Sequence, residues 1–201
     1  MRRRSTGALL AAVLSLTLPS LLQAQAIWRS ETTGLFVSGH GARGAIVFEN
    51  QTDNENGWGG GVAAGWGISQ LVTVYAGVSG ATIDLASVSD SYALVHVDVG
   101  ARFNFAGPGS RFRPYANAAL AGVAAGTDIG GDLFTISGGG LTLGGGIAYF
   151  LAKEVALDLG LQWTFDSFTE AEFRGAKSDI DLSATSARLS LGVSWWKGVG
   201  R

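Results

Sequence analysis

The chain has 201 residues, of which 47% are hydrophobic and only 15% are charged, with 31 glycines, 3 prolines and no cysteine. The lack of cysteine excludes a disulfide scaffold, a thiolate zinc site, an iron–sulfur cluster and a cysteine nucleophile. A formal net charge of −2 argues against a nucleic-acid-binding protein, which would need a basic stripe. At this length we expect one folded domain.

The first 26 residues have the features of a secretory signal peptide. Three arginines at positions 2–4 precede an apolar stretch over residues 8–22, and Ala24 and Ala26 form a small-residue cleavage motif. We therefore expect cleavage after Ala26 and a mature domain at residues 27–201. The apolar stretch is shorter than the ~20 residues of a spanning helix, so no transmembrane helix is predicted.

The rest of the chain alternates apolar and polar residues with a period of two, which indicates β-strands. In residues 92–105, for example, Val95, Val97 and Val99 share one face, while His96 lies on the other. Such long strands exceed the 5 to 6 residues usual in soluble sheets and match the ~9–11 residues needed to cross a bilayer. The predicted strands are residues 34–42, 57–68, 71–81, 92–105, 112–123, 136–151, 155–165 and 186–196.

Short and long connections alternate between these strands. The short ones are residues 69–70, 106–110 and 152–154, and the long polar ones are residues 43–56, 82–91, 124–135 and 167–183. Outer-membrane barrels have short periplasmic turns and long extracellular loops. We therefore predict an all-β, eight-stranded antiparallel up-and-down transmembrane β-barrel with both termini in the periplasm. The alternative is a soluble β-sandwich with the aromatic residues of these strands in its core.

Aromatic residues cluster near the predicted strand ends. Trp163 and Phe165 lie at the outer end of the seventh strand, and a larger group lies beside the short turns or the C-terminus. Two aromatic girdles are the expected arrangement in a membrane barrel. The larger group is Trp66, Phe103, Phe105, Tyr149, Phe150, Trp195 and Trp196.

Polar residues on the inward parity predict a filled lumen. An eight-stranded barrel is just wide enough for side chains to fill it, and charges in so dry a space must be paired. We expect a structural ion-pair network, with a proton or ion relay as the alternative. Its members would be His96, Asp98, Arg102, Arg113, Asn117, Asp158, Gln162 and Arg188.

These features, together with Arg113-Pro114-Tyr115 at the start of the fifth strand, resemble the outer-membrane β-barrel proteins of the OmpA-transmembrane-domain and OmpX type. The resemblance implies a monomeric barrel in the outer membrane of a Gram-negative-type bacterium. In that family the barrel-assembly machinery reads a last strand with alternating apolar residues and a terminal aromatic. The residues that match are Leu189, Leu191, Val193 and Trp195, although residues 197–201 extend past the aromatic.

Some barrels of this size modify lipid A, so catalysis is an alternative. Such an enzyme needs a hydroxyl nucleophile activated by an oriented base. The two histidines are His40 and His96, and Gly41-Ala42 after His40 departs from the His-x-Ser-Asn motif of the lipid A deacylases. We therefore expect no enzyme and no cofactor.

Acidic residues dominate the predicted loops. Divalent cations shared with lipopolysaccharide are one interpretation, since they prefer oxygen ligands, and simple solvated tips are the other. We expect a structural or adhesion-like role through these loops, with residues 46–48 as an adhesive edge and a small ion or solute pore as the alternative. The acidic residues are Glu49, Asp53, Glu55, Asp84, Asp90, Asp128, Asp132, Glu170, Glu172, Asp179 and Asp181.

Overall fold

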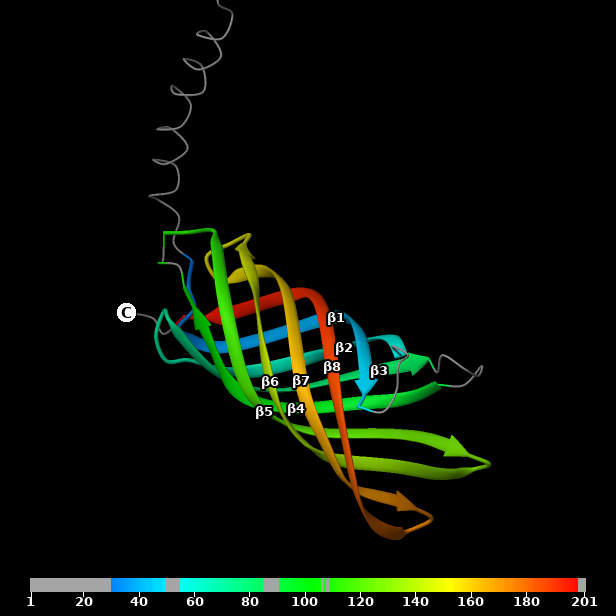
Figure 1. Ribbon diagram of the computed structural model, residues 1–201. Helices are drawn as coiled ribbons and strands as arrows, with labels where there is room; N and C mark the ends of the chain where they lie inside the picture. Colours follow the sequence, from blue (N-terminus) through cyan, green and yellow to red (C-terminus); the bar gives the residue numbers. More distant parts are fainter. Residues whose placement is uncertain (1–29, 50–54, 85–90, 106, 108, 199–201) are drawn as a thin grey trace, which may run out of the picture.

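The structure is a single closed β-barrel (Figure 1). It is a computed structural model that describes residues 30–49, 55–84, 91–105, 107 and 109–198. Eight antiparallel strands pair in chain order, and the first pairs with the last, so the predicted up-and-down barrel is confirmed. The strands are β1 (Gly34–Phe48), β2 (Glu55–Gly67), β3 (Val72–Asp84), β4 (Ser91–Asn104), β5 (Phe112–Ile129), β6 (Asp132–Phe150), β7 (Val155–Phe173) and β8 (Ala176–Lys197).

The outer wall of the barrel is apolar because the outward parity of the strands is apolar. Val97 and Val99 of β4 are exposed, as are Leu159 of β7 and Leu191 of β8. Soluble monomers rarely expose contiguous apolar patches larger than a few hundred Å², whereas such a belt is the usual surface of a membrane barrel. The closed barrel excludes the soluble sandwich. The described part of the chain has no helix of the length and apolar character needed to cross a membrane.

Two of the predicted long loops are strands instead. Residues 124–135 and 167–183 continue β5, β6, β7 and β8 and meet in two-residue turns. The turn residues Gly130, Gly131, Arg174 and Gly175 all have positive φ, as two-residue hairpins of the I′ type require. The prediction of loops was wrong here because such turns let the polar segments pair.

These extensions form two hairpins that project beyond the barrel, at the lower right of Figure 1. The register between β7 and β8 shifts between Phe168 and Glu170, and that between β6 and β7 shifts between Ser137 and Gly138. A β-bulge of this kind bends a strand and increases its twist. The bulge lies where the closed barrel gives way to the projecting sheet.

The opposite end of the barrel carries the short turns and an internal aromatic cluster. Phe150 and Trp196 are fully buried there, with ring centroids 5.5 Å apart, and Phe36 packs against Trp196 at 5.0 Å. Their placement in an outer girdle was therefore wrong, because both side chains have inward parity. Trp66 and Phe103 do lie on the outer surface near the turns.

Candidate functional site: the barrel lumen

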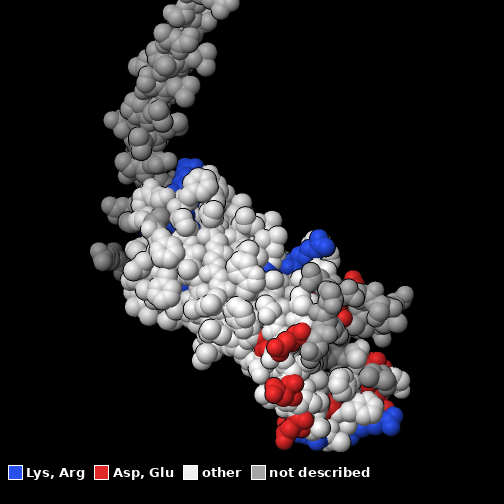
Figure 2. All heavy atoms as spheres, viewed as in Figure 1, with Lys and Arg blue, Asp and Glu red and all other residues white. Residues whose placement is uncertain are grey.

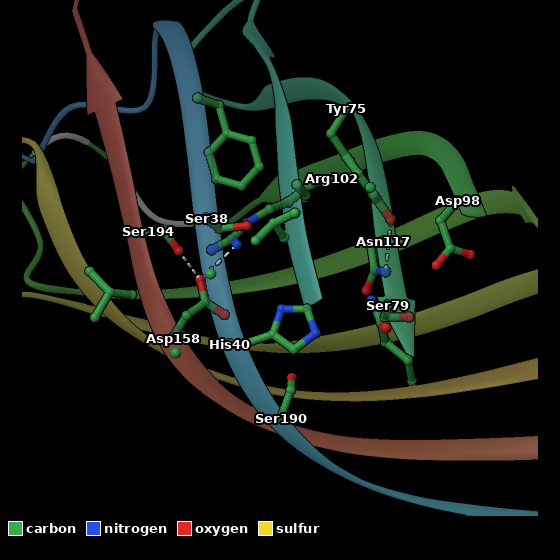
Figure 3. Close-up of a pocket in the computed structure, with 18 of the residues that line it drawn as sticks. Ser38, His40, Tyr75, Ser79, Asp98, Arg102, Asn117, Asp158, Ser190 and Ser194 are labelled. Atoms are coloured by element: carbon green, nitrogen blue, oxygen red, sulfur yellow. Dashed lines mark hydrogen bonds and ion pairs between the residues drawn. The ribbon is translucent and has the colours of Figure 1, made fainter. Parts of the chain in front are cut away.

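Three side chains from three strands meet around the carboxylate of a fourth strand in the half of the lumen nearer the turns (Figure 3). Asp158 of β7 accepts hydrogen bonds from Arg102 Nη1 of β4 at 2.7 Å, Tyr115 Oη of β5 at 2.5 Å and Ser194 Oγ of β8 at 2.7 Å. The Arg102 guanidinium lies 3.5 Å from the centroid of the Tyr115 ring. Gly146 makes room for the phenol, because a Cβ there would lie 2.5 Å from Tyr115 Oη.

A second charge pair lies further along the lumen toward the projecting hairpins. Arg188 Nη2 of β8 lies 3.2 Å from Asp98 Oδ2 of β4 and also donates to Thr164 Oγ1 at 3.3 Å. Ser79 of β3 accepts from Arg188 Nη1, and Thr142 of β6 donates to Asp98 Oδ1 at 2.7 Å. All five side chains are buried. Hydrogen bonds from several strands therefore compensate part of the cost of removing both charges from water.

A buried serine, histidine and aspartate form a third cluster, which tests the alternative of an enzyme. Ser186 Oγ donates to Asp166 Oδ2 at 2.9 Å and lies 3.3 Å from His96 Nε2, and the same Nε2 lies 3.5 Å from Asp166 Oδ1. A catalytic triad instead uses one ring nitrogen for the nucleophile and the other for the carboxylate. All three residues are at most 3% exposed. The cluster has neither the relay geometry nor the access that a hydrolase needs.

A cavity of about 90 Å³ separates the first two clusters. His40 of β1 projects into it between the Asp158 and Asp98 networks, and Ser190 lies beside the ring (Figure 3). Asn117 lines the same cavity and donates to Tyr75 Oη at 3.2 Å. A polar chamber of this size holds water readily.

Apolar side chains close the lumen at the end that carries the hairpins. Phe168 and Ile46 are fully buried in this apolar cluster, which lies beyond the His96 group. These side chains place an apolar layer between the chamber and the hairpin end of the lumen. The members are Ile46, Ile83, Leu94, Val123, Ala125, Phe168 and Ala184.

The chain before β1 closes the other end, and we call residues 30–33 the strap. Thr32 is fully buried; its hydroxyl donates to the backbone carbonyl of Gln70 at 2.9 Å and accepts from Arg113 Nη1 at 2.5 Å. Ser30 Oγ donates to the Ser110 carbonyl at 2.9 Å, and the Glu31 amide donates to the Lys153 carbonyl at 2.7 Å. The strap is thus tied to all three short turns.

Glu31 has the only strap side chain that titrates. Burial by itself would raise the pKa of this carboxylate, but hydrogen bonds from Thr33 and Gln70 and the charge of Lys153 hold the pKa below its ordinary value. The strap is therefore strengthened when Glu31 is ionised.

All eight residues predicted for the lumen lie on its inner wall, but the structure divides them. Arg113 donates hydrogen bonds to the strap, His96 belongs to the buried serine cluster, and Gln162 and Asn117 line the chamber. Sequence reasoning missed the hydroxyl and carboxyl partners that complete the networks. Inward parity was the signal that could have found them: Tyr75, Ser79, Tyr115, Thr142, Thr164, Asp166, Ser186 and Ser194.

Acidic side chains gather at the projecting end, while the barrel body presents few charges on the face in view (Figure 2). Most of the predicted loop acids lie on strands, and Glu55 is buried and accepts a hydrogen bond from Tyr92. Among the described residues, no group of three or more His, Asp or Glu side chains is placed to hold a metal ion. Asp53 and Asp90 lie outside the described residues, as do Ala24 and Ala26.

The adhesive edge predicted at residues 46–48 is already occupied. Ile46 pairs with Ser186 and Phe48 with Ala184, so β8 covers this part of β1. Beyond Ser183, whose carbonyl accepts from the Glu49 amide at 3.1 Å, β8 has no further strand partner on that side in the described ranges. Among the described residues, the edge of β8 at residues 176–182 therefore has no strand partner on its β1 side.

Three comparisons place this architecture among known proteins. The sequence profile described as outer membrane protein beta-barrel domain matches residues 8–195. Solved barrels with the same fold include Neisserial surface protein A (NspA), at 20% identity and a TM-score of 0.66 over 82% of this chain and 98% of that one. No curated protein sequence matches the chain.

Two further solved structures share the fold at lower identity. OprG from Pseudomonas aeruginosa is 11% identical, with a TM-score of 0.58 over 86% of this chain and all of that one. The attachment invasion locus protein Ail of Yersinia pestis is 12% identical, with a TM-score of 0.53 over 82% of this chain and all of that one. At such identities the likeness is one of fold.

Proposed function

Because the chain belongs to the outer membrane protein β-barrel domain family, we propose that it is a closed, non-catalytic barrel that acts at the cell surface through its projecting hairpins. Proteins of this family reside in the bacterial outer membrane. The observation that carries the proposal is that packed side chains close the lumen toward both ends, while a four-stranded sheet extends beyond the barrel.

The proposed orientation places the hairpins outside the cell and the strap in the periplasm. Short turns face the periplasm in barrels of this class, and the strap lies on the short turns. An N-terminus released by cleavage after Ala26 would start three residues before Ser30. On the outward face of β8, Leu189, Leu191 and Val193 are exposed, as a strand read by the assembly machinery requires.

The filled lumen argues against a pore. An ion crossing the barrel would have to displace the strap, the aromatic cluster at Phe36 and Trp196, two ion-pair networks and the apolar cluster at Phe168. Removing a charge from water into an apolar layer is costly. We therefore expect a monomeric barrel without steady conductance.

The projecting sheet supports a role in surface interaction. On β7 and β8, Glu170 is paired across strands with Asp179, and Glu172 with Lys177, which gives one face a polar, acidic character. An exposed strand edge offers free backbone groups to a partner, and in the described part of the chain the β8 edge at residues 176–182 has no strand partner on its β1 side. Recognition by added strands uses edges of this kind.

Two measurements test the proposal together. In planar lipid bilayers the refolded mature chain should show no single-channel current, and cells that display it should adhere to one another or to immobilised matrix proteins more than cells without it. Replacing residues 171–178 by Asn-Gly shortens the hairpin between the register partners Glu170 and Asp179 and should abolish that adhesion. Lys153→Ala, at the opposite end, is the matched control.

Two outcomes would contradict the proposal. Steady current from the wild-type chain would mean that the lumen opens and would favour the pore. Undiminished adhesion after the hairpin is shortened would move the interaction away from the β7–β8 sheet.

A further inference from the structure

One exposed arginine differs in position from every other basic residue of the described chain. Arg43 lies on the outer wall, on β1, where the hairpins begin. The other described basic residues point into the lumen, lie at the end with the short turns, or belong to the β7–β8 tip. The lumen holds Arg102, Arg113 and Arg188, the end with the short turns has Arg111, Lys153 and Lys197, and the β7–β8 tip has Arg174 and Lys177.

Arg43 is paired with an aromatic platform. Its register partner on β2 is Trp58, which is 71% exposed, and the guanidinium carbon lies 5.7 Å from the centre of the indole ring. A cation over an indole face is stabilised, and more strongly where water is excluded. The described residues give Arg43 no carboxylate partner within ion-pair distance, although acidic side chains occur on the hairpins just above it.

The position of Arg43 along the barrel axis determines which part of the lipid it contacts. Outward residues below it are apolar and exposed, such as Val62 on β2 and Leu191 on β8, while the wall above passes into the polar sheet. Counting from Leu35 along β1, Arg43 is the ninth residue, and a strand needs ~9–11 residues to cross the hydrocarbon. Arg43 therefore lies where the hydrocarbon ends and the lipid headgroups begin.

We propose that Arg43 and Trp58 form a binding site for one phosphorylated glycolipid of the outer leaflet, with the guanidinium on a headgroup phosphate and the acyl chains along Val62 and Leu191. Guanidinium and phosphate form bidentate, charge-assisted hydrogen bonds, and the planar fork of arginine suits them better than lysine. The inference rests on the proposed orientation, because at the inner surface the same pair would meet phospholipid.

The position also explains why one site is expected and not a ring of sites. The register partners of the pair on the neighbouring strands are Leu189 of β8 and Thr82 of β3, and neither carries charge. The projecting sheet is acidic, and its basic residues Arg174 and Lys177 are paired with Asp132 and Glu170, so Arg43 fixes where an anionic headgroup can approach the wall. We therefore expect a stoichiometry of one tightly held lipid for each barrel.

Native mass spectrometry of the refolded mature chain tests the site directly. With bis-phosphorylated lipid A, the wild-type barrel should retain one lipid after detergent removal. Arg43→Gln should weaken retention by about tenfold, the worth of a lost hydrogen bond between charged groups, and Trp58→Leu by about two- to fivefold. Lys197→Gln removes the same charge at the opposite rim and should leave retention unchanged. Heat-modifiable mobility in gels verifies that each variant folds.

The competing ligands separate the ways in which the inference can fail. Equal retention of dephosphorylated lipid A, equal loss in Lys197→Gln, or displacement of the lipid by inorganic phosphate would each overturn it. Retention of phosphatidylglycerol in place of lipid A, with the same dependence on Arg43, would overturn the glycolipid assignment and indicate the reverse orientation. None of these readouts depends on adhesion, so failure here is distinct from failure of the hairpin role.

Discussion

The same kinds of ion pair occur in two contrasting regions of this barrel. In the lumen, Arg102 and Asp158 have side chains that are 7% and 14% exposed, and their groups also engage several hydroxyls. At the β7–β8 tip, Lys177 and Glu170 lie 2.7 Å apart with side chains that are 59% and 40% exposed. Removing one partner of a buried pair leaves the other charge unpaired in a dry site, whereas water replaces the lost partner of an exposed pair.

The contrast shows that distance alone does not rank these interactions. Both pairs have a shortest N···O separation of 2.7 Å, yet their surroundings differ. The hydrogen bond to Glu170 raises the pKa of Lys177 above its ordinary value, but that group lies in solvent and salt screens its interactions. The lumen therefore fixes the shape of the barrel, and the hairpin pairs tune a surface.

The largest effect is expected from Asp158→Asn. The amide keeps the shape but removes the charge that Arg102 needs, so the buried guanidinium loses its ion-pair partner. We expect the free energy of unfolding to fall by about 3–5 kcal/mol, measured by urea titration of the barrel in lipid vesicles. A fall below about 1 kcal/mol would contradict the assigned role of the lumen pair.

Removing both charges sharpens the same contrast. Arg102→Met combined with Asp158→Leu should be clearly more stable than Asp158→Asn, because no charge is left unpaired. If the double variant is less stable than the single one, the network contributes more than its charges.

The second largest effect concerns the strap. Thr32→Val keeps the shape of a fully buried side chain but removes the hydroxyl between Gln70 and Arg113. We expect a loss of about 1–3 kcal/mol, the cost of leaving buried polar groups unpaired. Amide hydrogen exchange of Glu31 should become faster, while amides of the β7–β8 hairpin stay unchanged. Equal acceleration at both ends would show that the strap is not an independent unit.

A smaller effect is expected from pH acting on Glu31. Because folding lowers the pKa of this carboxylate, its contribution is fully present above the ordinary value of 4.5 and is lost as pH falls through the folded pKa. The group is only partly buried and water screens its interactions, so we expect less than about 1 kcal/mol. The wild type should lose stability between about pH 5 and about pH 3, the range in which carboxylates titrate. The Glu31→Gln variant should lose less stability over the same range. Equal losses of stability in the wild type and in Glu31→Gln would exclude a contribution of the Glu31 charge.

The smallest effect is expected at the hairpin tip. Lys177→Ala should leave the unfolding midpoint unchanged within error, because an exposed pair is largely replaced by water. Asp132→Asn, which removes the partner of Arg174, should also change the free energy of unfolding by at most about 1 kcal/mol. A loss comparable to that of Asp158→Asn at either site would remove the distinction between the two regions.

Much of the fold could be predicted from sequence because a strand has a strict period of two. Val95, Val97 and Val99 predicted the outward face of β4, and His96 and Asp98 the inward face, which the structure bears out. Strand ends were harder to predict. Polar residues at 124–135 and 167–183 suggested loops, yet a pair of residues with positive φ at each tip allowed them to continue as strands.

The candidate site, too, could be predicted from the sequence only in part. Inward parity placed Arg188 and Asp98 in the lumen, but their pairing depends on the stagger of β4 and β8, which lie on opposite sides of the barrel. Phe150 and Trp196 stand beside aromatic neighbours of opposite parity, so their inward position was missed. The strap was missed because the short segment before β1 has no periodic pattern and gains its partners from three separate turns.

The sequence by itself determined the strand period, the face of each side chain and the apolar outer wall, since these follow from local geometry and the transfer of apolar groups from water. Only the tertiary structure decided which lumen charges meet, how the ends close and where the free edge lies. Those features depend on contacts between residues far apart in the chain, such as Arg113 with Thr32, which barrel closure and stagger bring together.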